Sequence, residues 1–397
     1  MRDVIEDSRN GLLRQKVMAK GDLIREIVPT FNRQVRGILD AETCLGIQRV
    51  IMGGSGDSHF APMCTEMMFE AVAKLPTEAN RGMSIGRYTM PFLRENDVAR
   101  TLAIGVSVSG EVARSIELLS LAHDRGAYTL AVTANPESRI TKVANAVFNT
   151  KLEEGDDGAP GMRTYVASMI ALYMVALRLA DCRDAISQAE GDLWRKAMLR
   201  TADIIDETNK KISDKVRKVA EHLKDAPALV FFGSGPNFGT ALYAAAKIVE
   251  ADGWHERAED IEEWAHLQRF TRDRSTVCFV IAPPGLSYSR AVENCREMKR
   301  LGHYLVAVVR DGEKEISSIA DVVLPVYGDV PEPLTPLVYS NAVELFASDH
   351  SQVTGEPYFR GRREPWVVPG STWRPTQSGK IYETVAELDL PSVLKVD

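Results

Sequence analysis

Four serines in two short glycine-containing stretches have the spacing of an anion-binding site. Each stretch follows an apolar run, 47–52 or 101–106, and precedes a helical pattern. A strand–turn–helix junction of this kind presents backbone N–H groups and hydroxyls to a negative charge. The alternative is that the serines only cap helices. The residues concerned are Ser55, Gly56, Ser58, Ser107, Ser109 and Gly110.

A second set of residues could move protons. Tyr243, Lys247 and Glu250 share one face of a helix by their spacing, and His266 follows Trp264 in a later amphipathic stretch. A Lys or Glu near a helix end is usually solvated, and a His beside a Trp usually belongs to a core. Spacing alone therefore does not single these residues out.

Other chemistries lack their motifs. The glycine loop at 53–56 does not complete G-x-G-x-x-G, and no phosphate-binding G-x-x-x-x-G-K-[S/T] occurs, which disfavours a nicotinamide enzyme and a nucleotide hydrolase. His255-Glu256 does not extend to H-E-x-x-H, because Glu259 stands where the second histidine would be. The five cysteines form no C-x-x-C pair. We expect no metal and no cofactor.

The composition is that of a globular protein in a reducing compartment. The 397 residues carry a net charge of −7, with 45% hydrophobic and 26% charged residues. This balance disfavours nucleic acid as a partner, and the cluster Arg360, Arg362 and Arg363 is typical of a solvated turn. The N-terminus does not have the pattern of a signal peptide. We expect a cytoplasmic protein.

Apolar runs alternate with helical patterns from residue 46 onward. Runs at 47–52, 101–106, 128–133 and 145–150 are typical of buried strands, and their alternation with helices predicts a doubly wound parallel sheet. The stretch 162–179 is apolar enough to approach a membrane span. Its Arg163 and Arg178 favour a buried core helix instead, so no membrane association is expected.

The second half of the chain repeats the first. Gly54-Ser55-Gly56 matches Gly233-Ser234-Gly235 at an offset of 179, and 125–134 matches 301–310 at an offset of 176. Two matches in the same order indicate a duplicated α/β domain. The same offset places Pro283 and Gly285 where the first half has Ser107 and Ser109, so we expect the anion site in the first half alone.

These patterns divide the chain into five parts. A helical arm that includes Pro29, a predicted kink or boundary, precedes the repeats and is expected to pack on the first domain. A charged connecting helix separates the two domains, and a proline-rich tail follows them. The parts are the arm 1–40, the first domain 41–182, the connector 183–225, the second domain 226–354 and the tail 355–397.

Taken together, the strand with "SVSGEV" (107–112), the loop "GGSGDSHF" (53–60), "GAPGMRTY" (158–165) and the duplication resemble the sugar isomerase (SIS) family. The arrangement is similar to the isomerase half of glucosamine-6-phosphate synthase and to fructosamine-phosphate deglycases, over roughly 40–350. The resemblance implies two flavodoxin-like SIS domains and a sugar phosphate, or a related anionic sugar, as substrate.

The resemblance also implies roles for particular residues. The serine turn and the first loop would hold the phosphate, Lys247 and Glu250 would form the catalytic pair, and His266, sixteen positions after Glu250, would be the family histidine. Because that histidine often reaches the active site of a neighbouring subunit, a homodimer with a shared active site is implied. The reaction would be proton transfer between C1 and C2, in an isomerase or a deglycase; the alternative is a non-catalytic sugar-phosphate sensor.

Several positions depart from the family pattern. Val112 and Gly161 replace hydroxyl residues of the phosphate pocket, and Tyr243 replaces a second glutamate that is common in the synthases. Arg114 or Arg163 could compensate for the missing anion contacts. Arginines stand near 358–366, where the synthases have a lysine, and these changes weaken the expectation of amino transfer.

Overall fold

The computed structural model describes residues 11–153, 159–271, 274–360, 378 and 380–395. The chain divides into two compact units. The first-sheet unit contains Ile27–Gly155, Thr164–Leu193 and Thr372–Asp397. The second-sheet unit contains Met1–Glu26, Asp156–Arg163 and Trp194–Ser371. Each sheet lies wholly within one of the predicted domains, 41–182 or 226–354.

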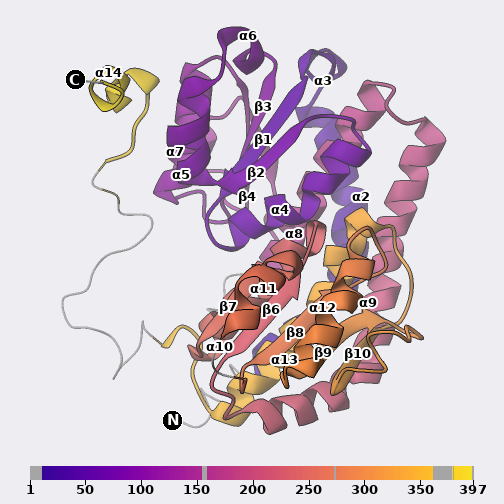
Figure 1. Cartoon of the computed structure of the whole chain (residues 1–397). Helices are drawn as coiled ribbons and strands as arrows, with labels where there is room; N and C mark the ends of the chain where they lie inside the picture. Colours follow the sequence, from indigo (N-terminus) through magenta and orange to yellow (C-terminus); the bar gives the residue numbers. More distant parts are fainter. Residues whose placement is uncertain (1–10, 154–158, 272–273, 361–377, 379, 396–397) are drawn as a thin grey trace, which may run out of the picture. The chain divides into compact units, whose positions relative to one another are not determined.

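The first-sheet unit is built on a five-stranded parallel sheet of order β2-β1-β3-β4-β5. Its helix α7 packs on one face through Ile116, Leu118 and Leu119, which contact strand residues such as Ala103 (Figure 1). The strands are β1 (Arg49–Gly54), β2 (Thr77–Arg81), β3 (Thr101–Val106), β4 (Tyr128–Thr133) and β5 (Ala146–Asn149). The helices are α3 (Ala41–Gly46), α4 (Asp57–Ala71), α5 (Gly82–Ser84), α6 (Glu95–Val98), α7 (Ala113–Asp124) and α8 (Met162–Cys182), of which the last begins in the other unit.

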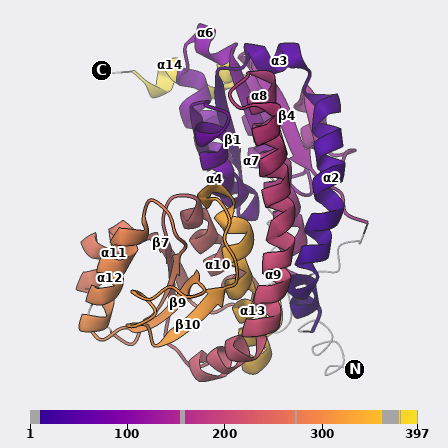
Figure 2. The same ribbon diagram turned by 90° about the vertical axis from the view of Figure 1, so that its right-hand side faces the viewer.

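The second-sheet unit repeats this architecture with order β7-β6-β8-β9-β10, again all parallel. Helices α11 and α12 cover one face of the sheet, and α10 and α13 the other (Figure 2). The strands are β6 (Leu229–Gly233), β7 (Glu256–Asp260), β8 (Val277–Ala282), β9 (Tyr304–Arg310) and β10 (Val322–Val326). The helices are α10 (Pro236–Asp252), α11 (Ile261–His266), α12 (Tyr288–Arg300) and α13 (Thr335–Thr354).

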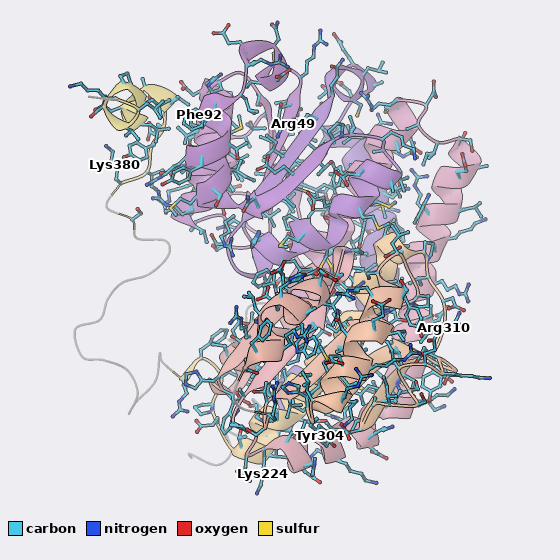
Figure 3. All side chains as sticks on the ribbon, in the orientation of Figure 1. Arg49, Phe92, Lys224, Tyr304, Arg310 and Lys380 are labelled. Carbon is cyan, nitrogen blue, oxygen red and sulfur yellow. The ribbon has the colours of Figure 1, made fainter. Side chains whose placement is uncertain are left out.

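Backbone details support the predicted duplication. Gly56 and Gly235 begin equivalent helices with nearly identical dihedral angles, φ 58° and ψ −133° against φ 56° and ψ −132°. Gly126 and Gly302 have φ of 88° and 89°, and each precedes the fourth strand of its sheet. Tyr304, labelled in Figure 3, begins that strand in the second copy as Tyr128 does in the first. Such left-handed positions favour glycine, so the same turn chemistry recurs at the predicted offsets.

The long helices refine two expectations. Helix α2 (Lys20–Ile38) continues through Pro29, so the predicted boundary there is wrong. Residues up to Glu26 belong to the second-sheet unit, where Arg14 and Lys20 pair with α13, rather than to the first domain as expected. Helix α9 (Gln188–Leu223) fills the predicted connector. Among the described residues α8 alone is long and apolar enough to cross a membrane, and it is mostly buried within the fold, as a core helix would be.

Candidate functional site

Both serine-bearing loops follow neighbouring strands at the point where the chain order of the sheet reverses. Strand β1 lies between β2 and β3, so the connections after β1 and β3 leave the sheet in opposite directions. In doubly wound sheets ligands bind in the crevice at this position. The two strand ends are close, because a Cβ atom on Gly54 would lie 2.7 Å from the carbonyl oxygen of Val106.

The loop after β1 ends at a helix start that has no side-chain cap. Gly56 is the N-cap of α4 and makes no side-chain cap hydrogen bond. The Ser55 side chain is exposed and Ser58 is half-buried. His59 is buried behind them, and burial lowers the pKa of its imidazole to about 4, which keeps the ring neutral near pH 7. Within this first turn, the N–H groups of His59 and Phe60 donate to the carbonyl of Gly56 at 2.8 and 3.1 Å, and the start of α4 has the polarity that favours a nearby anion.

The turn after β3 is held by its own backbone. The N–H of Gly110 donates to the carbonyl of Ser107 at 2.9 Å, and the N–H of Ile140 donates to the carbonyl of Gly110 at 3.1 Å. Gly110 has a φ of 67°, and a Cβ there would lie 1.8 Å from Oγ of Ser138. Glycine is required at this position for both its conformation and its close packing.

Ser107 has a buried hydroxyl that could bind an anion. Its side chain is 1% exposed, and its Oγ has no hydrogen-bond partner among the described residues. Helix α7 has Val112 at its N-cap and no side-chain cap, so Ser107 does not act as a cap. Ser109 is exposed and its Oγ accepts from the N–H of Glu111 at 3.2 Å. A buried hydroxyl without a partner is costly unless a ligand satisfies it.

The equivalent turn of the second copy already contains an anion. The offset of 176 places Leu286 where the first copy has Gly110. The N–H of Leu286 donates to both carboxylate oxygens of Glu332, each at 3.1 Å. A Cβ on Gly285 would lie 2.4 Å from the same carboxylate. The protein's own side chain thus occupies the second turn, which supports the expectation of an anion site in the first half alone.

Arg114 and Arg163 were the arginines expected to replace the missing anion contacts, and the structure gives each of them a different environment. Arg114 bonds to Glu117 at 2.6 Å and, through Nη2, to Ser378 at 2.6 Å in the tail. The backbone N–H of Tyr382, two residues after the Lys380 labelled in Figure 3, donates to the same buried Glu117 at 3.0 Å. Arg114 is therefore used to dock the tail on α7. Arg163 is the second residue of α8 and belongs to the second-sheet unit; Arg362 and Arg363 lie outside the described residues.

Lys247 and Glu250 are brought together on α10. The Lys247 side chain is fully buried, and its Nζ donates to Oε2 of Glu250, which keeps 30% of its side chain exposed. The backbone carbonyl of Glu250 accepts from the N–H of Phe359 at 2.8 Å, which pins the end of the helix to the segment after α13. A buried ammonium beside a partly exposed carboxylate can support proton transfer at a bound molecule.

His266 is not joined to this pair. It ends α11, its side chain is 65% exposed, and its Nε2 lies 3.1 Å from Oε1 of Glu262 on the same helix. The neighbouring Trp264 is buried, so it is the tryptophan and not the histidine that belongs to the core. The interval of sixteen residues from Glu250 remains the basis for its predicted role, and no described contact links it to Lys247 or Glu250.

The comparison with protein families identifies the first half. The SIS domain family model matches residues 46–178, which include all five strands of the first sheet and both serine-bearing loops. These residues form a SIS domain. The serine turn and the first loop lie within the matched residues.

The relatives and solved structures extend beyond this SIS domain. Glutamine–fructose-6-phosphate aminotransferase (isomerizing) of Gloeobacter violaceus is 27% identical over 82% of this chain and 52% of its own length. The C-terminal domain of glucosamine-fructose-6-phosphate aminotransferase from Francisella tularensis has a TM-score of 0.75 at 17% identity, covering 87% of this chain and 97% of that domain. A Clostridium novyi NT protein, provisionally assigned as a tagatose-6-phosphate ketose/aldose isomerase, has a TM-score of 0.75 at 16% identity, covering 95% of this chain and 96% of its own.

These matches differ in what they establish. The chain spans about half the length of the curated relatives it matches. The solved structures cover 87% and 95% of this chain, so the likeness in fold includes both sheets. The fold class expected from the sequence, two doubly wound parallel α/β domains, is confirmed.

Proposed function

We propose that this chain is a phosphosugar isomerase, or a deglycase of a ketosamine phosphate, that transfers a proton between C1 and C2 of an open-chain sugar. The pairing of the buried Lys247 ammonium with the partly exposed Glu250 carboxylate carries this proposal. A carboxylate that reaches solvent while a fixed positive charge stands beside it has the access and the electrostatics that an enediol-forming base needs.

The proposed step conserves atoms and charge. Glu250 takes the C2 proton of an aldose phosphate, or the C1 proton of a ketose phosphate, and the electron pair moves to the carbonyl oxygen to give an enediolate. Lys247 offsets the charge on that oxygen. The proton of the other enediol hydroxyl passes to the former carbonyl oxygen, and Glu250 returns its proton to the neighbouring carbon, which leaves the carbonyl on the second carbon. His266 assists ring opening, and its exposed position suits contact with the active site of a second copy, in a homodimer.

The far end of the substrate is assigned to the SIS domain. The phosphate, or a comparable anionic group, would be held by Ser107, whose buried hydroxyl has no partner among the described residues, and by the start of α4, which has no side-chain cap. Arg163 remains a candidate for a further contact. The contacts proposed for the anion come from Ser55, Gly56, Ser58, Ser107, Ser109 and Gly110.

The names of the relatives support a phosphosugar as substrate and a place in soluble sugar metabolism, which fits the proposed cytoplasmic location. They include an aminotransferase that isomerises fructose 6-phosphate and a provisional ketose/aldose isomerase. Isomerase and deglycase share the C1–C2 proton transfer, and they differ in whether an amine leaves afterwards.

Deuterium exchange tests the shared step directly. In D2O we expect the protein to exchange the C1 or C2 proton of one of three substrates: fructose 6-phosphate, glucosamine 6-phosphate or a fructosamine phosphate. Mass spectrometry of the recovered sugar measures the exchange, and assays for free amine and for the isomeric sugar then separate deglycase from isomerase. Binding without exchange would instead identify a sugar-phosphate sensor and refute the catalytic proposal.

Ser107→Ala should weaken sugar-phosphate binding by about 10- to 100-fold, since a hydrogen bond to a charged group is worth about 1.5–3 kcal/mol. The free energy of unfolding should hardly change, because the Ser107 hydroxyl makes no bond in the unliganded chain. Isothermal titration and chemical denaturation measure the two quantities.

Ser115→Ala is the matched control for this prediction. The Ser115 hydroxyl is also buried in the SIS domain but donates to the carbonyl of Val106 at 3.2 Å. Its loss should lower the free energy of unfolding by about 1 kcal/mol and leave binding unchanged. Equal binding in the Ser107 variant and the wild-type protein would remove Ser107 from the anion site.

A further inference from the structure

A buried chain of polar groups runs behind the Lys247–Glu250 pair. The hydroxyl of Tyr243 donates to Oε1 of Glu344 on α13 at 3.0 Å. The other carboxylate oxygen of Glu344 accepts from Nζ of Lys20 on α2 at 2.5 Å. Tyr243 and Glu344 have no exposed surface, and Lys20 is 1% exposed. All three groups belong to the second-sheet unit.

Each charged group in this buried network has a hydrogen-bond partner. Lys20 also donates to Oγ of Ser340 at 3.2 Å, so each oxygen of Glu344 and the ammonium of Lys20 have a partner. Burial lowers the pKa of Lys20, and the neighbouring Glu344 carboxylate opposes that shift. A buried ion pair seldom adds net stability compared with apolar side chains of the same size, so its presence calls for another explanation.

Tyr243 connects the buried chain to the catalytic pair. It lies four residues before Lys247 on α10, and the Nζ of Lys247 stands 5.0 Å from the centre of its ring. That distance is within the range of a cation–π contact. The hydroxyl end of Tyr243 is fixed by Glu344 and its face lies against the ammonium, which also bonds to Glu250.

We infer that Tyr243 is a positioning residue for Lys247, and that Glu344, neutralised by Lys20, fixes its orientation. The inference rests on the proposed function in so far as it assigns catalytic consequences to the position of Lys247. A fixed ring limits where the ammonium can stand, and a small misplacement of a catalytic charge costs rate rather than binding. Residues on α2 and α13 would thus set the turnover of a pair on α10.

Two variants interrupt this hydrogen-bond network at different points. Tyr243→Phe removes the hydroxyl and keeps the ring. The double variant with Lys20→Met and Glu344→Leu removes the ion pair and leaves the phenol without its acceptor; such apolar replacement of a buried pair tends to preserve folding. Tyr339→Phe, which removes the hydroxyl of another buried tyrosine on α13, is the matched control.

Both variants should lower kcat for C1–C2 exchange by about 3- to 10-fold with KM unchanged, the effect expected when one orienting hydrogen bond is lost. The Tyr339 control should behave as the wild-type protein. Because a smaller active fraction also lowers apparent kcat at constant KM, kcat is calculated per folded protein; a fall in kcat that disappears after this correction, together with a lower melting temperature, would indicate a general loss of structure and contradict the inference.

A second measurement does not need activity. In protein labelled with [ε-13C]lysine, the Lys247 signal is assigned by its loss in Lys247→Arg. The ring of Tyr243 should shield the Lys247 ε-protons, and in both variants their shift should move toward that of an exposed lysine, while the Tyr339 control leaves it in place. An unchanged Lys247 signal in both variants would overturn the inference. Absence of exchange in wild-type protein with all three sugars would refute the proposed function and leave this test intact.

Discussion

Glu250→Gln should reduce the rate of C1–C2 exchange by about 10²–10⁴-fold, the contribution typical of a positioned general base. Glutamine has nearly the same shape and can still accept the hydrogen bond from Lys247, but it cannot take a proton from carbon. The backbone bond from Phe359 to residue 250 does not depend on the side chain and should persist. Substrate affinity, measured by calorimetry, should therefore stay within about twofold, the change expected when no hydrogen bond is lost.

Glu256→Gln provides the comparison for this variant. Glu256 is a half-buried glutamate at the start of β7 in the same unit, and burial raises the pKa of its carboxyl. Its replacement removes a carboxylate without touching the Lys247 pair, so exchange should continue at the wild-type rate. Full activity in the Glu250 variant would exclude Glu250 as the base.

Gly110→Ala should destabilise the SIS domain by about 3 kcal/mol and weaken sugar-phosphate binding about 10-fold or more. The backbone at residue 110 has a φ of 67°, which is strained for alanine, and the new methyl group would lie 1.8 Å from Oγ of Ser138. The turn can accept the methyl only if its backbone shifts, which would move the Ser107 hydroxyl. Denaturant unfolding and calorimetry measure the two effects.

Gly126→Ala is the control that separates backbone strain at positive φ from the steric overlap with Ser138. Gly126 also has a positive φ, 88°, but a Cβ there would meet nothing within 4 Å. This variant should lose only about 1 kcal/mol and bind normally. Adding Ser138→Gly to the Gly110 variant should restore part of the lost stability and affinity. Equal losses in the Gly110 and Gly126 variants would mean that the contact with Ser138 is unimportant.

The central strands were predictable because they are buried on both faces. The expected runs 101–106 and 128–133 coincide with β3 and β4, whose residues are all buried except Tyr128. The edge strands β2 and β7 were missed, since "TEANR" and "ERAED" pair on one side only and carry charges at half-exposed positions. Apolar periodicity does not register such strands.

The site was predictable where it depends on turn chemistry and not where it depends on packing between distant elements. Both loops of the SIS domain could be identified from glycine and serine patterns, because the residues that shape each turn are neighbours in the chain. Glu332 and Glu344 could not be found in the same way, because their partners lie about 46 and 101 positions away in the chain. For Glu344 the sequence did contain a signal, because α13 has two acidic residues, Glu344 and Asp349, and no Lys or Arg that could pair with them.

The carboxylate of Glu332 makes the two halves of this protein unequal in their response to substrate. In the second copy the negative charge belongs to the protein itself, since the Glu332 carboxylate accepts from the N–H of Leu286. It is therefore present at a fixed effective concentration, whether or not metabolite is bound. Under the proposed function, the turn of the first copy takes the same charge from a bound substrate. The part of the ligand-linked folding free energy that arises at this turn grows with the logarithm of metabolite concentration, and the turn of the second copy has no such part.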